Sequence, residues 1–100
     1  MSRVTFISRM TVKAGREAEF VRLCTTLAER VHATESKERT LFYQFYKLRE
    51  PRRYAVIESF ASEADEHAHM TSPALAELGP GIVACLDGEY VREYLDPFAV

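Results

Sequence analysis

The stretch YAVIESFASEADEHAHMTSPALAEL, residues 54–78, decides the fold of this chain. It opens with a run of β-branched and aromatic residues, Tyr54 to Phe60, whose near-continuous apolar character predicts a strand covered on both faces. Ser62 then stands where a helix N-cap belongs, and acidic residues follow it in the first turn. After a short helix that carries His69, Ser72-Pro73 predicts a second capped helix, because proline at the first helical position loses no hydrogen bond.

The chain has 100 residues, of which 47% are hydrophobic and 28% are charged, and this predicts one domain over residues 1–100. The formal net charge is −2 and the basic residues are scattered, so we expect no nucleic-acid partner. No apolar stretch approaches the ~20 residues of a membrane span, and the N-terminus lacks the apolar segment of a signal peptide. We therefore expect a cytoplasmic protein with no membrane partner. Cys24 and Cys85 fit a reducing compartment as small buried hydrophobes, and the sequence leaves open whether they pair.

Three more strands and a long helix are expected from the rest of the chain. Alternating apolar residues predict a strand over Arg3–Val12, and apolar residues three and four apart predict a helix from about Arg16 to about Thr34. Further strands are expected over Thr40–Leu48 and Glu89–Leu95. The order β-α-β-β-α-β predicts a ferredoxin-like α+β fold, a four-stranded antiparallel sheet with helices on one face. Gly79-Pro80-Gly81 predicts a break or kink in the last helix.

The other face of this sheet is expected to be free of helices. The strand Thr40–Leu48 is apolar on both alternating faces, and a chain of this size has too few elements to cover both of them. A large apolar sheet face is rare on a soluble monomer, so we predict a homodimer in which two sheets pack face to face. Ile7 and Phe45 are placed on this open face, where a charged residue is expected to disrupt the dimer.

A local motif links the third strand to the helices that follow it. Glu58-Ser-Phe60, an acidic short helix and Ala68-His-Met-Thr-Ser-Pro73 resemble the antibiotic biosynthesis monooxygenase (ABM) domain, a dimeric α+β barrel. The resemblance spans Val4 to Leu95. It implies a homodimer whose subunits each hold a pocket between sheet and helices, and a cofactor-independent monooxygenase that acts on a quinol or a phenolic or polyketide small molecule. The family also contains haem-degrading enzymes, an isomerase of a small phosphorylated signal molecule and members with no known activity.

Two alternative functions stay open at this point. One is a non-catalytic small-molecule-binding or interaction module that keeps the fold and the cavity. The other is a haem-binding or haem-degrading protein, which the resemblance disfavours because the haem-ligating histidine of that branch falls near Gly79. His67 and His69 are two residues apart and do not share a helix face, which predicts no metal site. We expect no cofactor.

The resemblance also implies the residues of the pocket. Oxygenation without a cofactor requires the substrate to supply electrons as an anion, so the protein must provide a base and donors that hold this anion. We assign His69 as the catalytic base and Ser8 as the catalytic donor. The remaining pocket positions are assigned to the small aromatic substrate: Phe6, Met10, Tyr46, Phe60 and Leu75.

Three of these residues have a second interpretation. His69 can instead hold the start of the second capped helix through Ser72 or a backbone group. The hydroxyl of Ser8 can bond to a neighbouring backbone group, and Tyr46 can belong to the dimer interface. Glu58 can orient a histidine, but the favoured interpretation is an ion pair with Arg9 or Arg92 on the open sheet face.

Overall fold

The computed structural model describes residues 2–99, and its elements follow the predicted order, including the two capped helices expected after the third strand. The strands are β1 (Val4–Thr11), β2 (Thr40–Lys47), β3 (Arg53–Phe60) and β4 (Val91–Tyr94). The helices are α1 (Glu17–Thr34), α2 (Glu63–Met70) and α3 (Pro73–Ala84). None of the helices within residues 2–99 has the length and apolar character needed to cross a bilayer.

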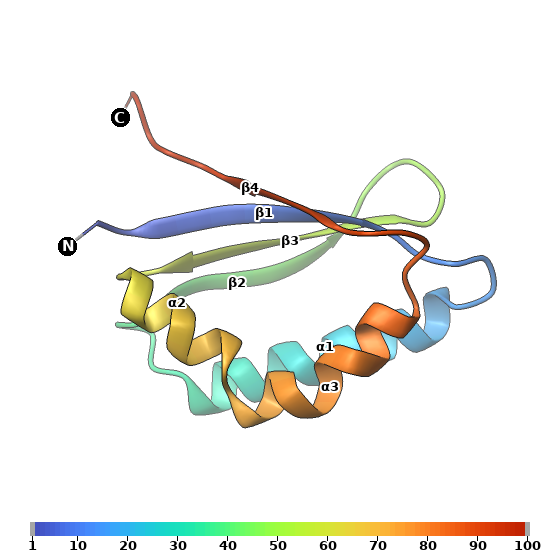
Figure 1. Cartoon of the computed structure of the whole chain (residues 1–100), viewed down its shortest axis with the longest axis horizontal. Helices are drawn as coiled ribbons and strands as arrows, with labels where there is room; N and C mark the ends of the chain where they lie inside the picture. Colours follow the sequence, from blue (N-terminus) through green and yellow to red (C-terminus); the bar gives the residue numbers. More distant parts are fainter. Residues whose placement is uncertain (1, 100) are drawn as a thin grey trace.

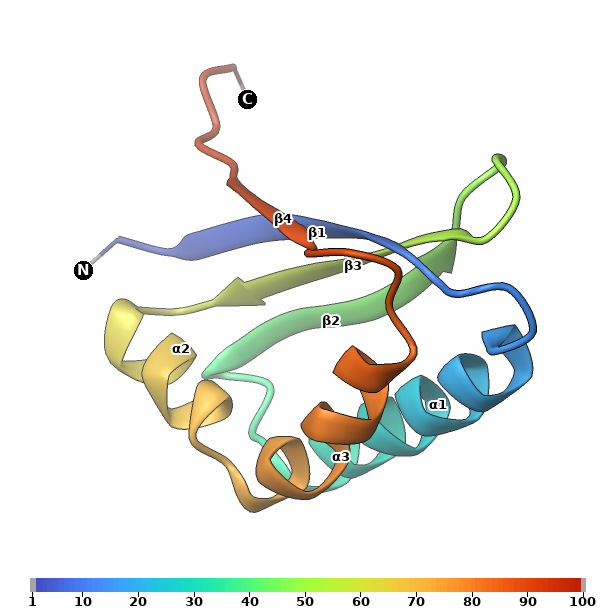
Figure 2. The same cartoon turned by 45° about the vertical axis from the view of Figure 1, so that its right-hand side comes forward.

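The four strands form one antiparallel sheet in the order β2-β3-β1-β4. All three helices lie on the same side of this sheet, as Figures 1 and 2 show. The predicted ferredoxin-like α+β fold is thereby confirmed. Register places Phe6 opposite Glu58 and Ser8 opposite both Val56 and Arg92. Because Phe6, Ser8 and Val56 are buried, this register identifies the helix-facing side of the sheet.

Both predicted caps are present at the ends of the short helices. Ser62 Oγ accepts a hydrogen bond from the backbone N–H of Asp65 at 3.2 Å, which starts α2. Ser72 Oγ accepts from the backbone N–H of Leu75 at 3.3 Å, which starts α3. Each cap satisfies a donor that a helix would otherwise leave free. The two caps set where α2 and α3 begin. They therefore also set the position of His69 near the end of α2.

The predicted break of the last helix at Pro80 is absent, since α3 runs from Pro73 to Ala84 as one helix. Proline removes one helical hydrogen bond, but α3 packs against α1. Gly81 permits this contact, because a Cβ at this position would lie 3.2 Å from Leu23 Cδ1 on α1. Packing against the long helix therefore holds α3 together through the proline.

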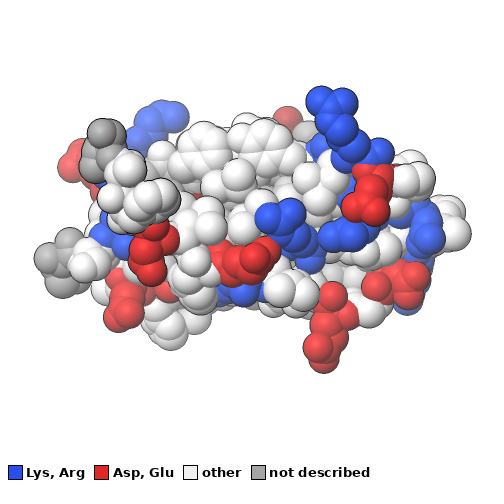
Figure 3. Space-filling view, turned by 90° about the horizontal axis from the view of Figure 1, so that it is seen from above, with Lys and Arg blue, Asp and Glu red and all other residues white. Residues whose placement is uncertain are grey.

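The helix-free side of the sheet exposes large apolar side chains. Phe42 and Tyr46 are 45% and 41% exposed on β2, and Val91 is 60% exposed on β4. Figure 3 looks down on this side and shows large uncharged areas between scattered acidic and basic side chains. Phe45 was expected here, and this placement is wrong. It lies opposite Val56 in the β2–β3 register and packs against the core on the helix side.

Candidate active site

A cavity of about 110 Å³ lies between the sheet and the helices α2 and α3. Most of its wall is apolar, including Met10 from β1 and Leu75 from α3. The residues that bring polar groups to the wall come from all four strand regions and α2: Ser8, Tyr43, Glu58, His69, Tyr90 and Arg92. An apolar cavity with a few converging polar groups is the usual form of a small-molecule site.

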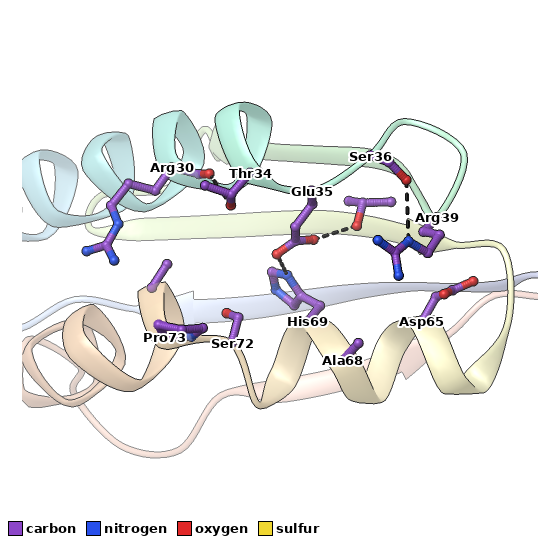
Figure 4. A pocket seen from close by; sticks show the side chains of 12 residues that line it. Arg30, Thr34, Glu35, Ser36, Arg39, Asp65, Ala68, His69, Ser72 and Pro73 are labelled. Carbon is purple, nitrogen blue, oxygen red and sulfur yellow. Dashed lines mark hydrogen bonds and ion pairs between the residues drawn. The ribbon is translucent and has the colours of Figure 1, made fainter.

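His69 stands at one end of the cavity, on the last turn of α2, and is 3% exposed. Its Nδ1 lies 2.8 Å from Glu35 Oε2, at the end of α1, and Figure 4 shows the two side chains facing each other. A carboxylate only accepts hydrogen bonds, so Nδ1–H is the donor in this contact. The ring also lies between two aromatic side chains, with centroids 5.0 Å from Tyr43 and 5.1 Å from Phe60. The imidazole is thus fixed in orientation.

Glu58 faces the other nitrogen of this ring, which overturns its expected place on the open sheet face. Its carboxyl group lies on the helix side, opposite Phe6 and Tyr43 in the register, and the residue is 6% exposed. Glu58 Oε1 is 3.4 Å from His69 Nε2, close enough for attraction but not aligned as a hydrogen bond. Among residues 2–99, this oxygen has no hydrogen-bond partner.

The surroundings of Glu58 favour its protonated form. Burial raises the pKa of Glu58 to about 8, and the carboxylates of Glu66 and Glu35 act in the same direction. The positive charge of Arg92 opposes them by lowering the pKa. A carboxyl group with a pKa near neutrality, in a cavity and without a partner, has the properties of a general acid or base.

Arg92 also lines the cavity and is held by contacts with neighbouring side chains. Its guanidinium donates to Glu66 Oε2 at 3.2 Å and lies 4.0 Å from the centroid of the Phe6 ring. Tyr94 also donates to Glu66 Oε2, at 2.9 Å. Burial raises the pKa of Tyr43 well above its usual range, so its phenol stays neutral. The cavity therefore has a fixed cation and a neutral phenol to face a bound anion.

The structure brings together four of the residues assigned to the pocket from sequence. Ser8, His69, Met10 and Leu75 all line the cavity. Phe6 and Phe60 are fully buried on the same side of the sheet, but neither lines this cavity, and the Phe60 ring packs against His69.

Tyr46 is not part of the pocket. It lies opposite Ala55 in the β2–β3 register, so alternation turns its side chain to the helix-free face, where it is 41% exposed.

Three residues of the site were missed or misplaced by the sequence analysis. Glu58 and Arg92 were assigned to the open face, although Glu58 alternates in phase with Tyr54, Val56 and Phe60, and this signal places it on the core side. Glu35 was part of a polar connector, and no local pattern marks it. Its contact joins residues 34 positions apart in the chain.

The acidic and histidine side chains around the cavity do not form a recognisable metal centre in the described part of the chain. Within residues 2–99, no group of three or more His, Cys, Asp or Glu side chains has the geometry to hold a metal ion. His69 instead makes one hydrogen bond, with Glu35, and lies 3.4 Å from the unbonded carboxyl oxygen of Glu58.

Comparison with protein families gives a match over residues 3–78 to the model described as antibiotic biosynthesis monooxygenase. The chain belongs to this family. An ABM relative of known structure, from Caulobacter crescentus CB15 and provisionally assigned as an antibiotic biosynthesis monooxygenase, is 26% identical with a TM-score of 0.88. The match covers 97% of this chain and 91% of that one.

Two other solved structures share the ABM fold. A conserved protein from Methanosarcina mazei Go1 is 25% identical over 95% of this chain and 92% of its own, with a TM-score of 0.84. The protein Rv0793 from Mycobacterium tuberculosis is 16% identical over 99% and 98% of the two chains, with a TM-score of 0.84, and shows the fold alone. A comparison with curated proteins gives no match.

Proposed function

We propose that this ABM protein is a monooxygenase of a single-ring phenol or quinol and that the substrate itself supplies the electrons. The observation that carries this proposal is the unpaired carboxyl group of Glu58, buried beside His69 in an otherwise apolar cavity. An unpartnered acid in such a place is costly to the fold. A ligand that offers a hydroxyl proton to Glu58 Oε1 would satisfy it.

The size of the cavity supports a small substrate. Its volume of about 110 Å³ compares with roughly 150 Å³ for an engineered cavity that takes up benzene. Pockets for drug-sized ligands are larger, at roughly 300–1,000 Å³. The space is therefore no larger than one aromatic ring needs, and a fused polyketide would have to extend well beyond it.

Glu58 is placed to start the reaction by taking the phenolic proton. The resulting phenolate donates an electron to dioxygen, and a C–O bond forms between a ring carbon and oxygen to give a ring peroxide. Glu58 returns its proton to the peroxide and then takes the hydrogen on the same ring carbon as a proton, which forms the C=O bond, breaks the O–O bond and releases hydroxide. Glu58 passes this proton to the hydroxide, which becomes water. The products are a quinone, which holds one oxygen atom, and water, which holds the other. The four electrons that leave the phenol reduce the dioxygen completely.

The fixed groups around the cavity stabilise the anion that this step creates. Arg92 supplies positive charge, and the neutral phenol of Tyr43 and the hydroxyl of Ser8 are donors on the sheet. Such donors help most when they are already in place before charge develops. His69 Nε2 is 3.4 Å from Glu58 Oε1, the oxygen that accepts the phenolic proton in this proposal. We therefore assign the proton-accepting step to Glu58, with His69 behind it, in place of His69 alone.

A haem group does not fit this site. The cavity of about 110 Å³ is much smaller than a macrocycle requires. Gly79, which the resemblance places near the ligand position of the haem-degrading branch, lines the cavity and has no side chain to bind iron. Both ring nitrogens of His69 face carboxyl groups.

We also propose that the helix-free sheet face is the interface of a homodimer. Phe42, Tyr46 and Val91 expose apolar surface there, which a second copy of the same sheet would cover. A cytoplasmic location stays a prediction, which cell fractionation can test.

Oxygen consumption with single-ring substrates tests the proposed activity. Phenol, catechol and hydroquinone are supplied to the wild-type protein, Glu58→Gln and the exposed-site control Glu93→Gln. We expect uptake above autoxidation in the wild type and the control, and a loss of roughly 100-fold or more in Glu58→Gln, the scale of assisted proton transfer. Calorimetric binding of the same compounds without any uptake would instead establish a non-catalytic binding module.

A further inference from the structure

His69 separates two spaces in the protein. On its inner side is the cavity that contains Glu58. On its outer side is a groove of about 280 Å³ between the end of α1 and the start of α3, which we call the Glu35 groove (Figure 4). Its polar lining includes Arg30, Glu35, Ser36, Arg39, Asp65 and Ser72. Of the residues that the structure describes, His69 alone lines both spaces.

The two nitrogens of His69 face opposite ways across this wall. Nε2 lies 3.4 Å from Glu58 Oε1 in the cavity, and Nδ1 lies 2.8 Å from Glu35 Oε2 at the groove. The two carboxyl groups differ in exposure, with 8% of the Glu58 side chain and 16% of the Glu35 side chain reachable by solvent. Thr40 Oγ1 donates to the second oxygen of Glu35 and fixes the rotation of this carboxylate.

We propose that His69 and Glu35 conduct protons between Glu58 in the cavity and water in the Glu35 groove. In one transfer, the O–H bond of Glu58 breaks and an N–H bond forms at Nε2. The N–H bond at Nδ1 breaks and its proton passes to Glu35, which releases it to groove water. The imidazole is neutral before and after, its tautomer changes, and the reverse transfer restores it. Glu35 touches no substrate and acts through His69, so it is a positioning residue.

The purpose of this route rests on the proposed function. Glu58 must be ionised to accept a phenolic proton, yet with a pKa of about 8 only roughly a tenth of it is ionised near pH 7. Once an aromatic ring fills the cavity, the apolar wall keeps water away from this carboxyl. Among the described residues, His69 is the basic side chain within ion-pair distance of this carboxyl. A proton path through the imidazole of His69 lets Glu58 lose and regain its proton while the substrate stays bound.

Several other charged or titratable groups surround this path and affect how readily Glu58 holds its proton. The carboxylates of Glu66 on α2 and Glu35 after α1 favour a proton on Glu58, whereas Arg92 on β4 disfavours one. Tyr43 on β2 packs against the imidazole and stays neutral. His69 therefore lies between two carboxyl groups, one in the cavity and one at the groove, and either can accept the proton that it passes on.

Nuclear magnetic resonance on the ligand-free protein tests the relay without any turnover. The chain has three histidines, so ¹⁵N-histidine labelling gives a spectrum simple enough to assign. We expect neutral His69 to carry its proton on Nδ1 and this proton to exchange with water through Glu35. In Glu35→Gln the amide oxygen can still accept the hydrogen bond, but exchange should slow by roughly 100-fold or more, the scale of general-base assistance.

Two control variants make this experiment decisive. Glu35→Asp keeps a carboxylate and should restore much of the exchange, which a purely structural bond would not require. Glu19→Gln removes a carboxylate from α1 that pairs with Arg16, and it should leave His69 unchanged. Exchange at the wild-type rate in Glu35→Gln, or a neutral His69 protonated at Nε2, would overturn the relay.

A second experiment follows the relay during catalysis. With a single-ring quinol, Glu35→Gln should lower kcat by roughly 100-fold, leave KM nearly unchanged and regain activity when imidazole is added, because imidazole can enter the Glu35 groove and take the proton from His69. Loss of activity that imidazole does not restore contradicts the relay. If the wild-type protein consumes no oxygen, the proposed function fails, and the exchange measurement alone decides the relay.

Discussion

Replacing Glu58 with glutamine should make the protein more stable, and by an amount that grows with pH. Burial raises the pKa of this carboxyl from its ordinary 4.5 to about 8. Below pH 4.5 the group is protonated in the folded and unfolded chains alike, so it has little effect on the free energy of unfolding. Between these two values the unfolded chain loses the proton while the folded chain keeps it, so the free energy of unfolding falls as pH rises.

The magnitude follows from the pKa change. Each pKa unit corresponds to about 1.4 kcal/mol, so a rise from 4.5 to about 8 makes the ionised carboxyl roughly 5 kcal/mol less stable in the folded state. Most of this effect, about 4 kcal/mol, develops between about pH 5 and about pH 9. Glutamine has nearly the same shape and does not titrate. The difference in unfolding free energy between Glu58→Gln and wild type should therefore widen by about 4 kcal/mol over this interval.

Urea unfolding followed by circular dichroism at a series of pH values measures this difference. Glu93→Gln is the matched control, because its carboxyl is about half exposed and pairs with Arg9 on the surface. It should keep a nearly constant offset from wild type. If the curves for Glu58→Gln and wild type also run parallel from pH 5 to pH 9, the carboxyl of Glu58 is not desolvated, and the assignment of Glu58 as the base loses its physical ground.

Three further predictions concern activity, capping and assembly. The kcat/KM for oxygen consumption should rise with pH to a plateau above about 8, as Glu58 ionises; a profile flat from pH 6 to 9 would exclude Glu58 as the base. Ser62→Ala removes the α2 cap and should lower the free energy of unfolding by about 1 kcal/mol, and an unchanged urea midpoint would contradict the cap's role. Ile7→Asp or Phe42→Asp should shift the proteins from dimer to monomer in sedimentation velocity, whereas a dimer that survives both changes would refute an interface on the helix-free face.

The fold could be predicted because its signals are local. Ser62 and Ser72 are followed by helices that begin where an N-cap predicts, and alternation in Arg3–Val12 gives the buried face of β1 correctly. The error at Pro80 shows where local reasoning ends. A missing backbone donor weakens an isolated helix, but here the helix lies against α1, and this contact is not visible in the sequence around the proline.

The site was predicted only in part, because it depends on contacts between distant segments. Ser8 and His69 lie on the cavity as expected. Phe45 was assigned to the wrong side of β2, and so was Tyr46 as a pocket residue, whereas its second interpretation put it on the helix-free face where it lies. Since both faces of this strand are apolar, its pattern does not say which face meets the helices, and only pairing with β3 decides it.

Glu35 illustrates the limit more clearly. Its importance comes from a single contact with His69, formed when the end of α1 meets the end of α2. In the chain it is one acidic residue among several in a polar connector. No periodicity or capping rule distinguishes it from Glu38, and a three-dimensional structure is needed to see the difference.

The shortness of β4 has a consequence for how the cavity behaves over time. This strand has four residues, pairs only with β1 and forms an edge of the sheet. Edge segments with few backbone hydrogen bonds open at a lower free energy than central strands. Arg92 is carried on β4, whereas Glu58 and His69 belong to β3 and α2. Local unfolding of β4 therefore removes Arg92 from the cavity before Glu58 or His69 moves. The backbone amides of β4 should exchange with deuterium well before those of β3.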